Sequence, residues 1–309
     1  MAAELLKRRF LADLVMETTR DNSYLSQTIN DDNLVNNNSV EIPNSGGRPG
    51  TEVNRTTFPA TITERTDVAH QYLLESITAN PIRVRDAEDA VVAYNKGRSA
   101  VIEAGQAIME TAADRAAYSW VQNGITTGNG NLILTTGAAR AATGPSQTGN
   151  RNAVAKEDIL EARRILMAQD MWRSNTGSKN MLITPSMEKD MLAIDDFVRA
   201  DAYGSGRIPS GALGTIYGLT VWVRSRAVTT DGSDVIKTEA AAAAATDQDA
   251  AIIWTSRSVR TAMSSPKIFL NQNVAEHYGM IVSSELRFGG VNARNDAKGI
   301  VVLAEDTNP

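Results

Sequence analysis

The chain has 309 residues, 42% of them hydrophobic and only 5% aromatic, with a formal net charge of −5. That length suits about two domains, and the negative charge argues against a dedicated nucleic-acid-binding domain, which is normally strongly basic. The sequence has no cysteine, which excludes disulfides, thiolate catalysis and cysteine-bound metal, and no stretch reaches the roughly 18 apolar residues of a membrane span, so we expect no membrane contact.

The first 38 residues predict a helix followed by an extended arm. Residues 2–19 place their large apolar side chains on one side of a helix, opposite Lys7, Arg8 and Arg9. These apolar residues are Leu5, Leu6, Phe10, Leu14 and Val15. Residues 20–38 are rich in Asn, Asp and Ser, a composition typical of a linker or arm. We expect ordered packing of the arm, and cover for the apolar side of the helix, to require a partner surface.

Residues 39–74 predict a long hairpin. Residues 39–42 are extended, 43–50 form a tip rich in Gly and Pro, and 51–74 alternate again as a return strand. A two-stranded hairpin with few apolar residues does not hold itself together in water. We therefore expect the hairpin to lie on a neighbouring molecule, with its more apolar end, residues 68–77, entering the main body.

Residues 86–122 predict one very long helix, about 55 Å in length. Apolar and small side chains recur at spacings of three and four residues up to Trp120. Gly97 and Gly105 each weaken such a helix by about 1 kcal/mol relative to Ala. They lie near the same helical face, which favours close approach of another backbone over two glycines that are merely tolerated.

The rest of the chain predicts a mixture of short strands and helices that ends in β structure. The terminal strands, 278–288 and 299–304, flank a turn rich in Gly and Asn, which is typical of a hairpin. The other predicted strands cover residues 132–134, 181–183, 219–224 and 251–254, and the other predicted helices cover 156–172 and 185–202.

Side chains that carry chemistry are sparse. The only histidines, His70 and His277, are expected to be half-buried in a sheet rather than catalytic or metal-binding. Ser186 and Lys189 match an S-x-x-K pattern whose companion motifs are absent. The Gly-rich stretches at 46–50 and 204–206 lack the remaining residues of phosphate or dinucleotide loops. The acidic pairs Asp195-Asp196 and Asp247/Asp249 are expected to be solvated surface, with weak divalent-ion binding as the lesser alternative. We expect no catalytic residue, cofactor site or metal site.

The order of these parts resembles the major capsid proteins of tailed bacteriophages, which have the Hong Kong 97-type fold. The resemblance spans nearly the whole chain and rests on order and spacing rather than on one motif. Residues 77–86, ITANPIRVRD, resemble the entry to the family's spine helix, and residues 214–225, GTIYGLTVWVRS, are similar to its Gly-x-x-x-Gly turn and following strand.

The resemblance implies an α+β fold with an N-terminal arm, an extended E-loop hairpin, a long spine helix, and peripheral and axial domains. The implied boundaries are 1–38 for the arm, 39–74 for the E-loop, 75–174 for the peripheral domain with its spine helix at about 86–122, 175–260 for the axial domain, and 261–309 for the return to the peripheral domain.

The function implied by the resemblance is structural rather than enzymatic. Copies of the chain would self-assemble into hexamers and pentamers of an icosahedral shell that encloses double-stranded DNA and contacts it non-specifically. A scaffold protein and a portal would be further partners, and the shell would be assembled in the host cytoplasm as part of the virion. The alternative is an encapsulin-like nanocompartment that encloses cargo enzymes, which the long Asn-rich arm disfavours. A soluble mixed α/β enzyme is a third hypothesis, which the poor chemistry of the side chains makes weaker.

Two departures from the family pattern carry expectations. Some members join subunits covalently through a Lys of the E-loop, but this chain has no Lys between Lys7 and Lys96, so we expect no such cross-link. The short segment before the E-loop leads us to expect a separate scaffold protein, or none, unless a longer prefix is removed. The residues expected at contacts between subunits are Phe10, Arg48, Arg55, Phe58, Arg65, Gly206 and Arg207.

Overall fold

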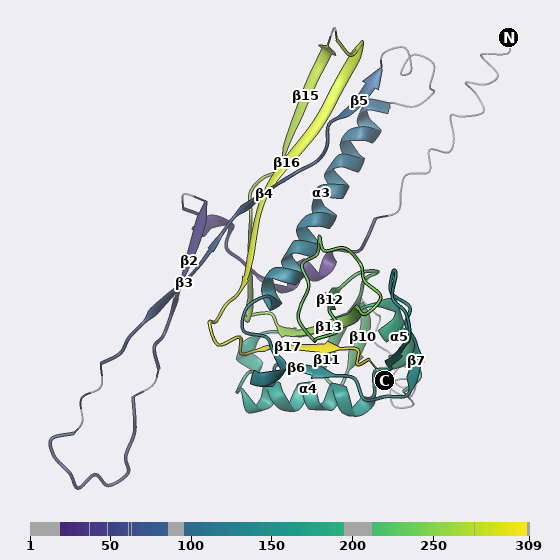
Figure 1. Cartoon of the computed structure of the whole chain (residues 1–309). Helices are drawn as coiled ribbons and strands as arrows, with labels where there is room; N and C mark the ends of the chain where they lie inside the picture. Colours follow the sequence, from purple (N-terminus) through teal and green to yellow (C-terminus); the bar gives the residue numbers. More distant parts are fainter. Residues whose placement is uncertain are drawn as a thin grey trace.

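A computed structural model describes residues 19–36, 38–47, 49–60, 62, 64–85, 96–194, 212–274 and 276–307 (Figure 1). An elongated part contains the long helix α3 and the ribbon of β15 and β16, a compact part contains a large sheet, and the hairpin of β2 and β3 projects away from both. The helix predicted at the N-terminus, the start of the long helix and the Gly-rich segment around residue 205 lie outside the described residues.

The elongated part is built around one 14-residue strand, β16 (Gly279–Asn292). Four of the other five strands in this six-stranded sheet pair directly with β16, all in antiparallel orientation. These partners are β4 (Glu75–Thr78), β5 (Ile82–Arg85), β14 (Val259–Met263) and β15 (Lys267–Val274), and the short β1 (Ile29–Asn30) pairs with β14.

Helix α3 (Lys96–Val121) lies along β16 and packs on it through small side chains. Its buried alanines lack the bulk that would hold the helix away from the sheet, which permits close contact. They are Ala100, Ala104, Ala112, Ala113, Ala116 and Ala117. Gly105 was expected to meet another backbone, but a Cβ placed there would meet no atom of the chain within 4 Å. No backbone among the described residues makes the expected approach.

The compact part is a seven-stranded sheet in the order β10-β11-β9-β13-β17-β6, with β12 paired to β13. Its strands are β6 (Leu132–Leu134), β9 (Lys179–Ile183), β10 (Ala212–Ile216), β11 (Leu219–Val223), β12 (Val228–Thr230), β13 (Gln248–Thr255) and β17 (Ile300–Ala304). Alternate residues of β13 and β17 join two different cores, one with α3 and the other with α4 (Lys156–Ala168) and α5 (Pro185–Leu192). Both faces of the sheet are thus buried, which explains the continuous apolar runs of these strands.

The remaining described elements are short. They are the 3-10 turns η1 (Ser23–Gln27), η2 (Asp32–Leu34), η3 (Thr127–Asn129) and η4 (Ser174–Thr176), and the two-stranded pairs β2 (Ser39–Asn44) with β3 (Val68–Leu73) and β7 (Ala139–Ala141) with β8 (Asn150–Asn152).

The predicted C-terminal hairpin is wrong. Strand β17 pairs with β13 and β6 in the seven-stranded sheet and not with β16. All five residues of β17 are buried, so this strand requires cover on both faces. Strand β17 therefore belongs to the large sheet.

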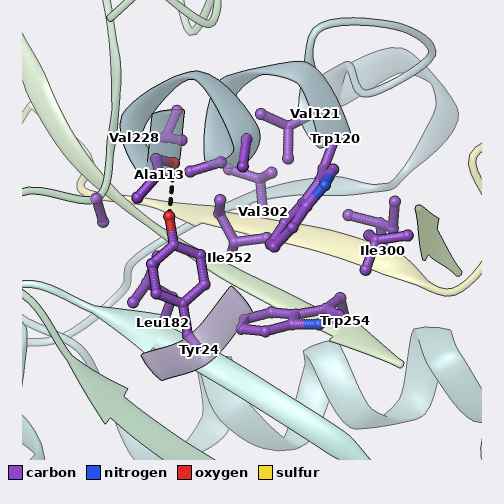
Figure 2. Close-up of a cluster of buried hydrophobic side chains, with 14 of the residues drawn as sticks. Tyr24, Ala113, Trp120, Val121, Leu182, Val228, Ile252, Trp254, Ile300 and Val302 are labelled. Carbon is purple, nitrogen blue, oxygen red and sulfur yellow. Dashed lines mark hydrogen bonds between the residues drawn. The ribbon is translucent and has the colours of Figure 1, made fainter. Parts of the chain in front are cut away.

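The arm at residues 20–38 packs on the chain itself, contrary to the expectation that it would need a partner surface. Tyr24 of η1 is buried with its ring edge-on to Trp120 and Trp254, at centroid distances of 5.8 and 6.3 Å (Figure 2). Its hydroxyl donates a 2.6 Å hydrogen bond to the carbonyl oxygen of Ala113 in α3. The arm thereby joins α3 to the large sheet.

Candidate assembly surfaces

The base of the hairpin, formed by β2 and β3, is anchored in the body by an apolar cluster. Val40, Ile42 and Tyr72 are between 1 and 6% exposed, and they pack with Leu74, which follows β3, and with Ala262 and Val291 from the chain's own six-stranded sheet. The apolar residues of β2 alternate with exposed ones, so one face of the ribbon lies on the body. The base is therefore held without any neighbouring molecule.

Two further features hold the base close to β16. A Cβ at Gly289 would lie 2.9 Å from the carbonyl oxygen of Leu73, so glycine is what allows the two strands to approach. The Tyr72 hydroxyl donates a 3.0 Å hydrogen bond to the buried carboxylate of Asp31, which also pairs with Arg260 at 3.1 Å. Burial of this hydroxyl raises the pKa of Tyr72, with the charge of Asp31 adding to the effect.

The paired strands end at a tight neck. The last pair of the ladder is Asn44 with Val68, and just beyond it the amide of Gly46 donates a 3.0 Å hydrogen bond to Asp67 Oδ1. A Cβ at Gly46 would lie 1.5 Å from the carbonyl oxygen of Thr66, so only glycine fits there. The bond from the Gly46 amide, assisted by Arg65, lowers the pKa of the Asp67 carboxyl.

Beyond the neck, the described residues of the tip loop (residues 45–67) form no strand. The return strand was expected to begin at residue 51, and it begins at Val68 instead. The outgoing strand stops at Asn44, so the alternating residues 51–62 have no partner to pair with. Their apolar side chains face solvent: Val53 is 87% exposed, Phe58 75% and Ile62 92%.

Four of the seven residues expected at subunit contacts fall within residues 45–67, and three of them, Arg55, Phe58 and Arg65, are among the described residues. Phe58 projects into solvent, whereas Arg55 and Arg65 form ion pairs with Glu52 at 3.3 Å and Asp67 at 2.6 Å. Carboxylates of the same loop thus neutralise these two arginine charges. The exposed apolar side chains Val53, Phe58 and Ile62 remain available for contact with another molecule. The four that lie outside the described residues are Phe10, Arg48, Gly206 and Arg207.

A second exposed apolar surface, on strand β15, was not anticipated from the sequence. This strand lies at an edge of the six-stranded sheet, and Ile268, Phe269 and Leu270 are each about half exposed. An edge strand leaves backbone N–H and C=O groups without partners. The sequence feature that could have indicated this surface is a run of three large apolar residues between the polar residues at 267 and 271.

A group of buried charges lies at the large sheet rather than on either exposed surface. Arg140 of β7 pairs with Asp190 at 2.9 Å and with Glu305, whose second carboxylate oxygen has no hydrogen-bond partner. Burial, with the nearby charge of Asp249, raises the pKa of Glu305 to about 7. Burial likewise raises the pKa of Asp249. This group holds the β7–β8 pair on the sheet.

Several side chains considered for chemistry have structural partners, and the expectation that Asp247 and Asp249 are solvated surface is wrong, because both are buried at the large sheet. His70 Nε2 lies 3.1 Å from the Asn292 side-chain oxygen, Ser186 contacts Asp249 at 3.4 Å, and Asp247 pairs with Lys237 at 2.6 Å. Within the described residues there is no group of three or more His, Asp or Glu residues that could hold a metal ion. Among the same residues, no helix has the length and apolar character needed to cross a membrane.

Comparison with known proteins agrees with this arrangement. Residues 2–305 match the model of a family described as phage capsid protein. A search of curated protein sequences gives no significant match.

Several solved structures share the fold across nearly the full length of both chains. A chain of the cyanophage Pam1 capsid is 11% identical, with a TM-score of 0.65 over 96% of this chain and 94% of that one. A chain of the cyanophage P-SCSP1u capsid is 13% identical, with a TM-score of 0.64 over 95 and 91%. A Mycobacterium phage Che8 chain is 13% identical, with a TM-score of 0.62 over 94% of each.

Proposed function

Because this chain belongs to the phage capsid protein family, as a major capsid protein with the Hong Kong 97-type fold, we propose that its copies assemble into hexamers and pentamers of an icosahedral shell around double-stranded DNA. The family identifies a structural component of the virion and does not favour the encapsulin-like alternative. The shell is assembled in the host cytoplasm, with a scaffold protein and a portal as further partners.

The observation that carries this proposal is the tip loop. Val53, Phe58 and Ile62 face solvent at the end of a hairpin whose base is firmly packed. A subunit that placed this loop on the next copy would bury apolar surface without refolding its body. Repetition of one such heterologous contact around an axis gives a ring when the rotation between neighbours closes, and a rotation of one sixth or one fifth of a turn would give a hexamer or a pentamer.

The two parts of the molecule then take different places in the ring. We assign the seven-stranded sheet with α4 and α5 to the axial domain, and the six-stranded sheet with α3 to the peripheral domain. Strand β17 supports a change from the boundaries expected from the sequence, because it pairs within the first of these sheets. The β15 edge, with its three exposed apolar residues, is a second surface for contact with a neighbour.

The proposed relation to DNA is one of confinement. The net charge of −5 gives the wall no overall attraction for phosphate, and a strongly basic wall would bind DNA in a salt-dependent manner. DNA contacts are therefore local and non-specific.

Negative-stain electron microscopy of the recombinant protein, alone and with its scaffold, tests the assembly. The chain is compared with a variant in which Val53, Phe58 and Ile62 are each replaced by Ser. The matched control replaces Leu34, Val235 and Leu192, which are also exposed but lie away from the tip loop, by Ser.

We expect polyhedral shells or rings from the unchanged chain and from the control, and none from the tip-loop variant. A chain that stays monomeric under both conditions would contradict the proposal. Shells from the tip-loop variant would show that this loop is not the contact on which assembly depends.

A further inference from the structure

The connection between α3 and β6 carries both Asn-Gly pairs of the sequence, Asn123-Gly124 and Asn129-Gly130. The backbone nitrogen of a glycine can attack the side-chain amide carbon of the asparagine before it, because glycine has no Cβ to obstruct the approach. Both asparagines are exposed, and both glycines have left-handed backbones, with φ of +76° and +73°. Exposure and glycine conformation therefore do not distinguish the two pairs.

Hydrogen bonds hold the side chain of Asn129 at both of its polar atoms. Its Oδ1 accepts from the backbone amides of Thr126 and Asn131, each at 3.2 Å, and its Nδ2 donates to the carbonyl oxygen of Gly124. The attacking atom is held as well, because the amide of Gly130 donates a 3.2 Å hydrogen bond to the first carbonyl of η3. Attack would have to break several of these bonds, so the fold protects Asn129.

The side chain of Asn123 has no comparable restraint. Within the described residues, no hydrogen bond engages its amide or the N–H of Gly124. Its main chain is fixed instead, because the carbonyl oxygen of Asn123 accepts a 2.9 Å hydrogen bond from the Asn292 side chain. The amide carbon of Asn123 can therefore rotate toward the glycine nitrogen while the backbone stays in place.

We propose that Asn123 is a site of spontaneous deamidation in the folded subunit and that Asn129 is protected from the same reaction. The N–H of Gly124 loses its proton to a solvent base, and its nitrogen forms a bond to Cγ of Asn123. The bond from Cγ to Nδ2 breaks, and ammonia leaves with a proton taken from water. Water then opens the resulting succinimide ring at either carbonyl, which leaves aspartate or isoaspartate at position 123.

The reaction changes charge and backbone at the end of α3. A helix carries partial negative charge at its C-terminus, so a new carboxylate there is unfavourable. Isoaspartate also inserts an extra carbon into the backbone where the carbonyl of Asn123 accepts its bond from Asn292. The side-chain oxygen of Asn292 lies 3.1 Å from His70 in β3, so the altered residue is linked to the hairpin base through one side chain. The inference concerns the single subunit and does not rest on the proposed function.

Peptide mapping by mass spectrometry tests the proposal on the full chain, incubated unassembled at mildly alkaline pH. The fraction of each Asn-Gly peptide in which the amide has become a carboxyl is followed with time. The same incubation in urea, where both pairs are unfolded, gives their intrinsic rates. The Asn123→Gln variant is the matched control, because its longer side chain disfavours closure of the ring.

In the folded chain we expect Asn123 to react at least about tenfold faster than Asn129, a difference of about 1.4 kcal/mol in the barrier. The two rates should converge in urea, and Asn123→Gln should remove the early product. Equal rates in the folded chain, or no reaction at Asn123 where the unfolded chain reacts readily, would overturn the proposal. A gap of the same size in urea would assign the selectivity to neighbouring residues and overturn the protective role of the fold.

Discussion

The two ends of the β2–β3 hairpin have opposite relations to the rest of the molecule. At the base, Val40 and Tyr72 are buried against the chain's own sheet, and the side chains of Tyr72 and Asp31 are joined by a hydrogen bond. In the tip loop, Phe58 and Ile62 face solvent, and Arg55 and Arg65 are matched by carboxylates of the same loop. One hairpin thus separates stability, which resides at the base, from assembly, which we assign to the tip.

The largest loss of stability is expected from Tyr72→Ala, at the base of the hairpin. Removal of the ring leaves a cavity in the apolar cluster and deprives Asp31 of a hydrogen bond. We expect a loss of about 3–5 kcal/mol in the free energy of unfolding, measured by urea denaturation. Tyr72→Phe keeps the ring and should lose only about 1–2 kcal/mol. A loss below about 1 kcal/mol for Tyr72→Ala would mean that the base is not anchored as described.

A rise in pH from about 4.5 to 7 should act on stability through a carboxyl of the body, Glu305. The raised pKa of Glu305, about 7 against an ordinary 4.5, means that the folded chain takes up a proton which the unfolded chain has released. Stability should therefore fall as pH rises from about 4.5 to 7 and change no further through this group above 7. Arg140, Asp190 and Asp249 surround the carboxyl and set the size of the effect.

Glu305→Gln is the variant that isolates this effect. It should flatten the fall in melting temperature between pH 4.5 and 7. Above pH 7 it should raise the free energy of unfolding by up to about 3 kcal/mol. Loss of the ion pair with Arg140 reduces this gain. Thermal melts across this pH range supply the measurement. An unchanged pH slope in the variant would show that folding does not raise the pKa of Glu305.

At the neck, Gly46→Ala should produce a local loss. The added Cβ would overlap the carbonyl of Thr66, so the backbone must move and the bond from the Gly46 amide to Asp67 must lengthen. We expect a cost of about 1–2 kcal/mol confined to the end of the ladder, seen as faster hydrogen exchange of the amides at 44–46 and 66–69. The matched change Gly47→Ala, where a Cβ meets nothing within 4 Å but φ is +130°, separates overlap from backbone strain. Normal exchange in Gly46→Ala would place the boundary between base and tip elsewhere.

The smallest effect on stability is expected at the tip itself. Replacement of Val53, Phe58 and Ile62 by Ser removes no contact within the subunit, because all three side chains are exposed. The free energy of unfolding of the monomer should change by less than about 0.5 kcal/mol, although the same variant should fail to assemble. A clear loss of monomer stability would show that the tip packs on its own body.

Much of the fold could be predicted where the signals are local. The Ala-rich repeat of α3, the buried run of β13 and Pro185 at the start of α5 each identify their element from neighbouring residues. The α+β class and the order of arm, hairpin and long helix follow from such segments. Their agreement with capsid structures confirms the predicted fold class.

The errors arose where a partner distant in sequence decides the structure. The apolar run of β17 indicates a strand but not that it pairs with β13 and β6 rather than β16. Tyr24 is one aromatic residue in a polar arm, and its place between Trp120 and Trp254 depends on the assembled core. Residues 51–62 alternate as a strand does, yet the outgoing strand is too short to pair with them. The exposure of β15 likewise follows from its position at the edge of the sheet, which depends on strand pairing distant in sequence.

The central claim is that the tip loop contacts a neighbouring subunit, and the most direct measurement is a cryo-electron microscopy map of the assembled particle. The account predicts closed shells in which Phe58 is buried against the next subunit while the base packs as it does in the single chain. Shells in which residues 45–67 remain in solvent would contradict it.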